Sequence, residues 1–201
     1  MRRAEFEIKD KAALEGLLSE CEYGSLALLD GDAPYCIPLN FVWFEDSICF
    51  HGSHEGRKVQ LIAKNQKASF SAVKPYSLIP SYFSGTISAC PATHYFASAY
   101  IEGEISKIEN DAEKCAVLNA LMQKLQPEGG YETIEATNPI YTKMISQTAV
   151  FRLKAAKTSL KAKLGQNLTP QNMQNIIEQL ANRGSQTDTE TIEAIKRIGQ
   201  K

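Results

Sequence analysis

Residues 34–73 constrain the fold of this chain more than any other stretch. Within residues 35–44, large apolar side chains recur at every second position, which predicts a β-strand with two distinct faces. Residues 45–47 supply a turn, and residues 48–50 return as a buried strand. Ahead of them, the sequence DGDAP at residues 30–34 predicts a hairpin turn. Antiparallel strands therefore dominate this part of the predicted fold.

Pro38 lies inside the first of these strands, where its missing N–H cannot donate to a neighbouring strand. The position predicts either a bulge or an edge strand. Backbone groups left free there could contact a ligand, and a simple irregularity of the strand is the alternative.

A basic loop follows the hairpin and leads into a short helix. Residues 51–58 contain two histidines, two glycines and the adjacent cations Arg57 and Lys58. Apolar residues at helical spacing follow, and Asn65 can end the helix. Free N–H groups, the helix dipole and two fixed positive charges would converge at the start of such a helix. The loop is therefore a candidate phosphate cradle; the alternative is a surface helix that merely begins with a basic pair.

The rest of the chain adds strands and helices to this centre. Further strands are predicted at residues 23–29, 67–73, 95–108 and 148–155, and helices at residues 10–21, 111–125, part of 131–145, and 170–183. Residues 187–190, with the sequence TDTE, predict the capping box of a last helix. Residues 74–93 lack a clear period and are expected to form a loop with a short helix.

Composition excludes several classes of protein. With 201 residues, 43% apolar and 22% charged, the chain is expected to be globular. A net charge of −1 argues against a nucleic-acid partner. No apolar run approaches the roughly 20 residues that span a bilayer. The opening MRRAEFEIKD lacks the apolar stretch of a secretory signal, so a cytoplasmic protein with no membrane contact is expected.

The five cysteines are odd in number and include no C-x-x-C pair, so reduced thiols are expected. Cys90 and His94 stand four positions apart, and Cys49 and His51 stand two apart. Because further ligands at a usual spacing are missing, no metal site is predicted.

The segments PYCIPLNF, FHGSHEGRK and SAYIEGEISKI, in this order, resemble the FMN-binding split-barrel family of pyridoxamine 5'-phosphate oxidase-like proteins, nearest its nitroimidazole-reductase branch. The resemblance implies a mainly β (β+α) fold: a six-stranded antiparallel split β-barrel with inserted helices over residues 1–165. Residues 166–201 would form a C-terminal helical extension that packs on the barrel or on a partner subunit. It also implies a homodimer with FMN at the subunit interface.

The same resemblance implies which residues contact FMN. The implied contacts are Pro38, Leu39, Asn40 and Phe41 on one strand, His51 and Gly52 at the end of the next, Arg57 and Lys58 at the phosphate, and Ser98. Asn40 would meet the pyrimidine edge of the flavin, since its amide both donates and accepts. Ser98 stands where the family has a longer glutamine. His51 is the candidate catalytic residue, as a proton donor, and His54 is expected to face solvent.

The sequence departs from pyridoxamine phosphate oxidase itself. That enzyme has an arginine at the place of Cys36 and a lysine at the place of Phe41, and it ends in a segment bearing tryptophan and arginine. The implied function is an FMN-dependent oxidoreductase that takes hydride from NAD(P)H and reduces a small oxidised substrate such as a nitroaromatic compound. Two alternatives are a non-catalytic flavin carrier or redox sensor, and a β-barrel interaction protein that binds no small molecule.

Overall fold

The computed structural model describes residues 3–199, and the chain divides into two compact units. Unit 1 comprises Met1–Asp10, Val73–Ser98 and Ser159–Lys201, and unit 2 comprises Lys11–Ala72 and Ala99–Thr158. Residues 1, 2, 200 and 201, which belong to the two predicted domains, lie outside the described part. The strands β6 (Lys67–Ile79), β7 (Thr93–Ile108) and β8 (Ala149–Lys163) contribute residues to both units.

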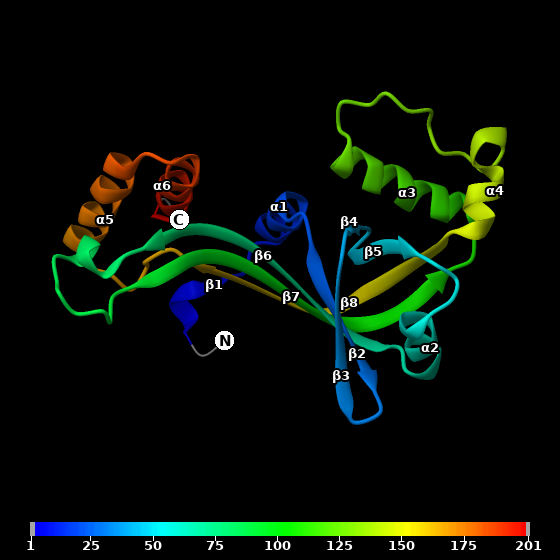
Figure 1. Ribbon diagram of the computed structural model, residues 1–201, viewed down its shortest axis with the longest axis horizontal. Helices are drawn as coiled ribbons and strands as arrows, with labels where there is room; N and C mark the ends of the chain where they lie inside the picture. The colour runs from blue at the N-terminus through cyan, green and yellow to red at the C-terminus, as the bar shows by residue number, and fades with distance from the viewer. Residues whose placement is uncertain (1–2, 200–201) are drawn as a thin grey trace. The chain divides into compact units, whose positions relative to one another are not determined.

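The strands form one mainly antiparallel sheet with the order β3-β2-β6-β7-β8-β5-β4, and β1 pairs with β8 (Figure 1). The shorter strands are β1 (Glu7–Ile8), β2 (Gly24–Asp30), β3 (Ala33–Leu39), β4 (Val42–Phe44) and β5 (Ser47–Gly52). The helices are α1 (Lys11–Glu20), α2 (Arg57–Lys64), α3 (Asp111–Leu125), α4 (Pro139–Gln147), α5 (Pro170–Arg183) and α6 (Gln186–Gly199), with 3-10 turns η1 (Ala4–Phe6) and η2 (Ser81–Ser84). The predicted mainly β, β+α class is confirmed. The described sheet has eight strands and does not close.

The predicted strand over residues 35–44 is in fact two strands with different partners. β3 ends at Leu39 and pairs with β2 through the predicted hairpin turn, with Asp30 opposite Ala33. β4 begins at Val42 and pairs with β5. Glu45 and Asp46 join them with φ values of 48° and 56°, the positive values that a tight hairpin turn requires. β3 is the last strand on its side of the sheet order, which confirms the edge strand predicted from Pro38.

The expectation of a loop over residues 74–93 is wrong in its first part, because β6 continues to Ile79. The buried positions of β6 are the even-numbered residues from Ala68 to Ala72, but they become Ser77 and Ile79 further along. This change of face, on either side of Pro75, interrupts the alternation that identifies a strand. β8 likewise changes face and extends eight residues beyond the predicted end at residue 155.

Caps explain where the helices begin. Asn138 caps α4 and Thr169 caps α5, and each helix carries proline in its first turn. The predicted capping box at residues 187–190 is wrong, because Ser185, directly before α6, forms the box with Asp188. The Ser185 Oγ accepts from the Asp188 N–H at 3.1 Å, and the Asp188 carboxylate accepts from the Ser185 N–H at 3.1 Å.

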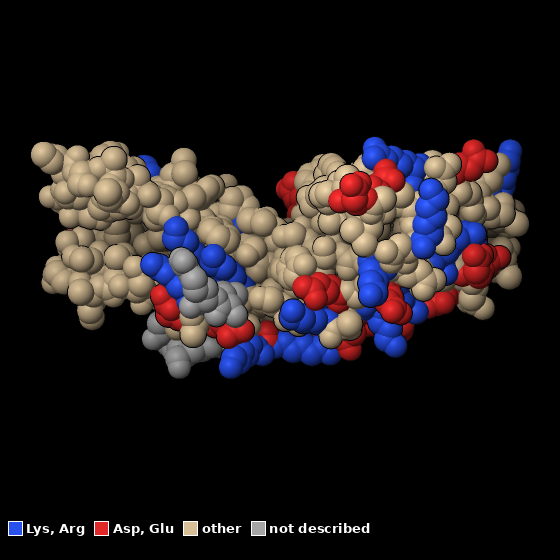
Figure 2. Space-filling model, turned by 90° about the horizontal axis from the view of Figure 1, so that it is seen from below, with Lys and Arg blue, Asp and Glu red and all other residues tan. Residues whose placement is uncertain are grey.

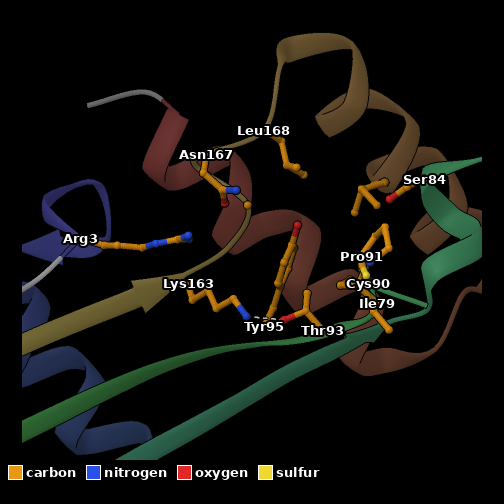
Figure 3. A pocket seen from close by; sticks show the side chains of 13 residues that line it. Arg3, Ile79, Ser84, Cys90, Pro91, Thr93, Tyr95, Lys163, Asn167 and Leu168 are labelled. Carbon is orange, nitrogen blue, oxygen red and sulfur yellow. Dashed lines mark hydrogen bonds between the residues drawn. The ribbon is translucent and has the colours of Figure 1, made fainter. Parts of the chain in front are cut away.

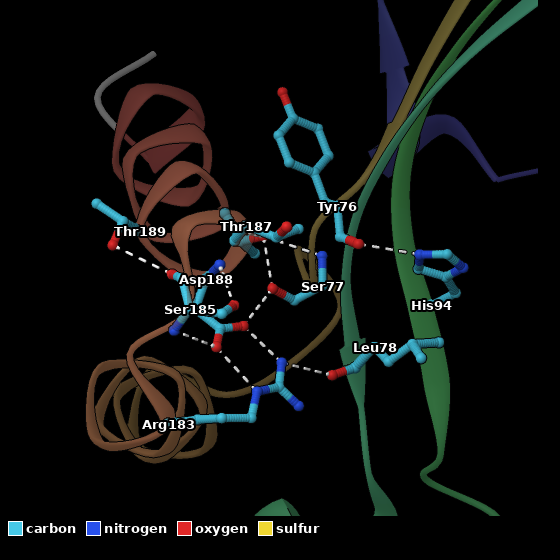
Figure 4. Close-up of polar contacts among 10 residues, drawn as sticks. Tyr76, Ser77, Leu78, His94, Arg183, Ser185, Thr187, Asp188 and Thr189 are labelled. Atoms are coloured by element: carbon cyan, nitrogen blue, oxygen red, sulfur yellow. Dashed lines mark hydrogen bonds and ion pairs between the residues drawn. The ribbon is translucent and has the colours of Figure 1, made fainter.

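Asp188 also fastens α6 to β6 within unit 1 (Figure 4). Its carboxylate is 1% exposed and accepts hydrogen bonds from Arg183 at 2.5 and 2.9 Å and from the Ser77 hydroxyl at 2.6 Å. Thr191 joins the same network by donating to the Ser77 hydroxyl at 2.9 Å. A buried carboxylate is stable only when it is satisfied in this way.

The core of unit 2 contains many large side chains that are less than 2% exposed. They include Phe41, Phe50, Phe70, Ile48, Ile101, Ile105, Phe151 and Leu153. Phe50 and Phe151 stack with ring centroids 5.3 Å apart, on the paired strands β5 and β8. Each such side chain contributes about 1.5–3 kcal/mol through burial. Phe50 directly precedes His51 at the end of β5, so this part of the core adjoins the start of the basic loop.

Candidate functional site

The end of β5, residues 53–56 and the first turn of α2 form one corner of unit 2, which we call the basic corner. It contains His51, Gly52, His54, Arg57 and Lys58. The N-cap of α2 is Gly56, with φ at 111° and no side-chain cap hydrogen bond. A glycine is required there because L-residues rarely adopt this φ. The first N–H groups of α2 are therefore not capped by a side chain, and such a helix terminus attracts anions.

Lys58 is the cation that the basic corner leaves without a counter-ion. Its Nζ lies 5.0 Å from the centroid of Phe50 and 5.4 Å from that of Phe151. Burial lowers the pKa of its ammonium group, and none of the carboxylates in residues 3–199 is paired with it. A Cβ atom on Gly52 would lie 2.8 Å from this Nζ, so the glycine makes room for the ammonium group.

Arg57, the neighbouring cation, is already engaged. Its Nε and Nη2 donate to the Asp30 carboxylate at 2.8 and 2.5 Å, and its guanidinium lies 4.4 Å from the centroid of the Tyr35 ring. Asp30 comes from β2 and Tyr35 from β3, so the hairpin positions Arg57. The side chain remains 61% exposed, which makes this ion pair a weak one.

The two histidines of the basic corner differ. Partial desolvation and then the charge of Lys58 lower the pKa of His51 below its ordinary value, which favours the uncharged imidazole, although the residue as a whole is exposed. The expectation that His54 faces solvent is wrong, because its Nε2 is buried and has no hydrogen-bond partner. A buried polar atom of this kind is rare in native proteins and is expected to find a partner in a bound ligand or water.

The four predicted flavin contacts at residues 38–41 differ in how accessible they are. Pro38 is exposed and Leu39 half-buried on the edge strand β3, where backbone groups face away from β2. The Asn40 amide donates to the carbonyl of Glu22 at 3.3 Å. Phe41 is 1% exposed and packs edge-on against Phe70, with centroids 4.8 Å apart. Only the first three therefore present an accessible side chain or strand edge.

Ser98, the remaining predicted contact, lies half-buried on β7 and belongs to unit 1. The residues that sequence reasoning missed are Asp30, Tyr35, Phe50 and Phe151, which position the two cations. Asp30, Tyr35 and Phe151 lie far from residues 57–58 in the sequence, and Phe50, eight residues before Lys58, carries no local signal of this contact. The sequence predicted the strands that carry Tyr35, Phe50 and Phe151 but not their contacts with the two cations.

Neither a metal centre nor a membrane span is present within residues 3–199. No group of three or more His, Cys, Asp or Glu side chains there could hold a metal ion, and no helix is long and apolar enough to cross a membrane. Cys36 and Cys90 are exposed, Cys21, Cys49 and Cys115 are buried, and no disulfide joins any two of them in the described part of the chain. On the face drawn in Figure 2, Lys and Arg side chains are interspersed with Asp and Glu.

Comparison with known proteins identifies one family. The family described as pyridoxamine 5'-phosphate oxidase matches residues 10–162. No curated protein sequence matches the chain.

Solved structures with the same fold include three of about 20% identity. A protein of Bacteroides thetaiotaomicron described as a 5-nitroimidazole antibiotic resistance protein is 20% identical, with a TM-score of 0.62, over 78% of this chain and 86% of that one. The FAD and heme binding protein of Mycobacterium smegmatis is 21% identical, with a TM-score of 0.66, over 78% and 73%. The flavocytochrome Anf3 of Azotobacter vinelandii is 22% identical, with a TM-score of 0.65, over 79% and 69%.

Proposed function

Because the chain belongs to the pyridoxamine 5'-phosphate oxidase family, we propose that the basic corner binds the phosphate of FMN and that the protein is a flavin-dependent oxidoreductase. The observation that carries the proposal is the half-buried ammonium group of Lys58, which has no counter-ion beside Gly52. Burying a charge without a partner is unfavourable, and an incoming phosphate relieves this cost.

The chemistry of the corner fits a phosphate monoester. The group is close to dianionic at neutral pH and needs several charge-assisted donors. Lys58 supplies one, the uncapped N-terminus of α2 supplies backbone N–H groups, and the orphaned Nε2 of His54 accounts for another contact. Arg57 is tied to Asp30, whose carboxylate offsets its charge, and it therefore contributes less than Lys58.

The other predicted residues would either contact the flavin or support the residues that do. The exposed edge at Pro38 and Leu39 supplies backbone groups to the ring system, and Asn40 supplies an amide when it releases Glu22. Phe41 supports this edge from the core. Ser98 and a second subunit would complete the site in a homodimer.

When bound, FMN supplies hydride and electron transfer, and the protein supplies orientation and protons. We infer a reductase that uses NAD(P)H and acts on a small oxidised substrate such as a nitroaromatic compound. His51 is the candidate proton donor; because its pKa is lowered, its uncharged imidazole would first accept a proton at the free ring nitrogen and then pass it to the substrate.

Visible absorbance and FMN titration of purified variants test the proposal. We expect Lys58→Met to weaken FMN binding about 10- to 100-fold, because a charge-assisted hydrogen bond contributes about 1.5–3 kcal/mol. Arg57→Met should lose less, since Arg57 already has a carboxylate partner. Lys64→Met, at the exposed far end of the same helix, is the matched control and should bind normally. Unchanged FMN affinity in Lys58→Met would refute the phosphate cradle.

Turnover is tested separately. Steady-state oxidation of NADH or NADPH by the flavin-loaded protein, with and without a nitro compound, distinguishes a reductase from a flavin carrier or redox sensor. Nicotinamide oxidation that rises with the nitro compound supports the reductase. Flavin binding without any turnover would replace it with the carrier.

A further inference from the structure

A cavity of about 310 Å³ lies wholly within unit 1 (Figure 3). None of the residues of the basic corner lines it. The strands β7 and β8, the segment that follows β8, and helix α5 line it, and Arg3 reaches it from the N-terminal segment. Its polar lining includes Arg3, Thr93, Tyr95, Lys163 and Asn167. The volume is at the lower end of the range for small-molecule sites.

The charge of this cavity is one-sided. Arg3 and Lys163 line it, and no carboxylate among residues 3–199 does. Lys163 donates a hydrogen bond to the Thr93 hydroxyl, and its pKa is lowered by burial and then by the nearby charges of Lys161 and Arg3. The Glu5 carboxylate offsets part of the charge of Arg3, with its Oε1 4.0 Å from the Arg3 Nε. Lys163 is partly buried and the Arg3 side chain is 53% exposed, so two like charges face one cavity, where an anion would stabilise them.

The other lining groups give the cavity a protonated donor and an apolar wall. Tyr95 is 2% exposed, and burial raises the pKa of its phenol to about 12, so the hydroxyl stays protonated. Gly165 has φ at 86°, and a Cβ there would lie 2.4 Å from the Tyr95 hydroxyl. Only glycine allows the chain to pass this phenol. Pro91, Leu168 and Ile176 supply apolar surface.

We propose that this cavity binds a small organic carboxylate with an apolar body. The carboxylate lies at Lys163 and Arg3, and the apolar body packs on Leu168 and Ile176. A monoanion suits the site, because Glu5 already offsets part of the charge of Arg3. A planar carboxylate can accept from both an ammonium and a guanidinium group. The proposal is independent of flavin binding, because no residue of the basic corner lines the cavity.

Isothermal titration of the full-length protein with benzoate, benzamide and inorganic phosphate tests this site. We expect benzoate to bind, and its neutral isostere benzamide and inorganic phosphate to bind at least tenfold more weakly. Lys163→Gln should weaken benzoate binding about 10- to 100-fold, because it removes a charge-assisted hydrogen bond. Lys196→Gln, on the exposed face of α6 in the same unit, should leave the affinity unchanged.

If Lys163→Gln does not fold, Lys163→Arg is measured in its place. Because this variant keeps the positive charge, its affinity for benzoate should stay within about tenfold of the original. Tyr95 resonances in the NMR spectrum locate the ligand and should shift on titration. Three results would each overturn the proposal: no benzoate binding, equal affinity for benzamide, or unchanged affinity in a folded Lys163→Gln variant. Tighter binding of phosphate than of benzoate would overturn the ligand class.

Discussion

Replacing Gly52 by alanine should separate flavin binding from stability. The new Cβ would lie 2.8 Å from the Lys58 Nζ and 3.7 Å from its Cε, where ordinary contact begins near 3.4 Å. Since Nζ is the far end of a flexible side chain, the ammonium group moves away rather than the strand. The backbone of Gly52 pairs with Ala149 in a regular ladder and accepts an alanine.

Two opposite effects follow from this geometry. Alanine reduces the conformational entropy of the unfolded chain, which raises the free energy of unfolding by about 0.4–1 kcal/mol. Displacement of the ammonium group by several tenths of an ångström weakens its contact with the phosphate, and we expect FMN affinity to fall about tenfold. Urea unfolding measures the first effect, and quenching of flavin fluorescence on titration into the flavin-free protein measures the second.

Gly16→Ala is the control, because a Cβ on Gly16 in α1 meets no atom within 4 Å. It should stabilise the protein by about 0.5–1 kcal/mol and leave FMN affinity unchanged. Adding Gly52→Ala to Lys58→Met should have little further effect on affinity, since both changes act through one ammonium group. Native affinity in Gly52→Ala would contradict the assignment of Lys58 to the phosphate, and additive losses would mean that Gly52 acts in another way.

Two further predictions concern the attachment of α6. Asp188→Asn should lower the free energy of unfolding by about 2–3 kcal/mol, less than for a fully buried pair because the Arg183 side chain is 36% exposed. The Arg183 guanidinium holds the pKa of Asp188 well below its ordinary value. The contribution of Asp188 to the free energy of unfolding is therefore complete above about pH 4 and declines as the pH falls further. Urea unfolding between pH 3 and 7 measures this dependence of stability on pH, which Asp188→Asn should reduce. Ser185→Ala should cost about 0.5–2 kcal/mol as a lost cap, whereas Thr187→Ala should change stability by less than about 0.5 kcal/mol. A larger loss in Thr187→Ala than in Ser185→Ala would restore the capping box predicted from the sequence.

The capping box illustrates what local patterns can and cannot decide. Both Ser185-x-x-Asp188 and Thr187-x-x-Glu190 have a hydroxyl followed three residues later by a carboxylate, so the sequence supports either. The choice is made by Ser77, 111 residues away, because its hydroxyl and Arg183 satisfy a buried Asp188. The same limit applies to β6, where a change of buried face in the middle of the strand hides it from a search for alternation.

At the basic corner, too, the sequence predicts the position of the two cations but not their partners. The order of strand, glycine-containing loop and helix predicted correctly that Arg57 and Lys58 stand at the start of a helix. In the sequence the two cations are equivalent. In the structure Arg57 is neutralised by Asp30, which lies 27 residues away, whereas Lys58 is half-buried on two aromatic rings with no counter-ion.

This asymmetry has a consequence for how an anion is bound. Phosphate bound at Lys58 gains the full benefit of a cation that has no competing partner, in surroundings where burial has already removed much of its water. Phosphate bound at Arg57 must compete with the Asp30 carboxylate for the same donors, and the exposed pair is screened by solvent. In the proposed site, the affinity for phosphate would therefore depend mainly on Lys58. Arg57 pairs with Asp30 and so links the β2–β3 hairpin to the start of α2.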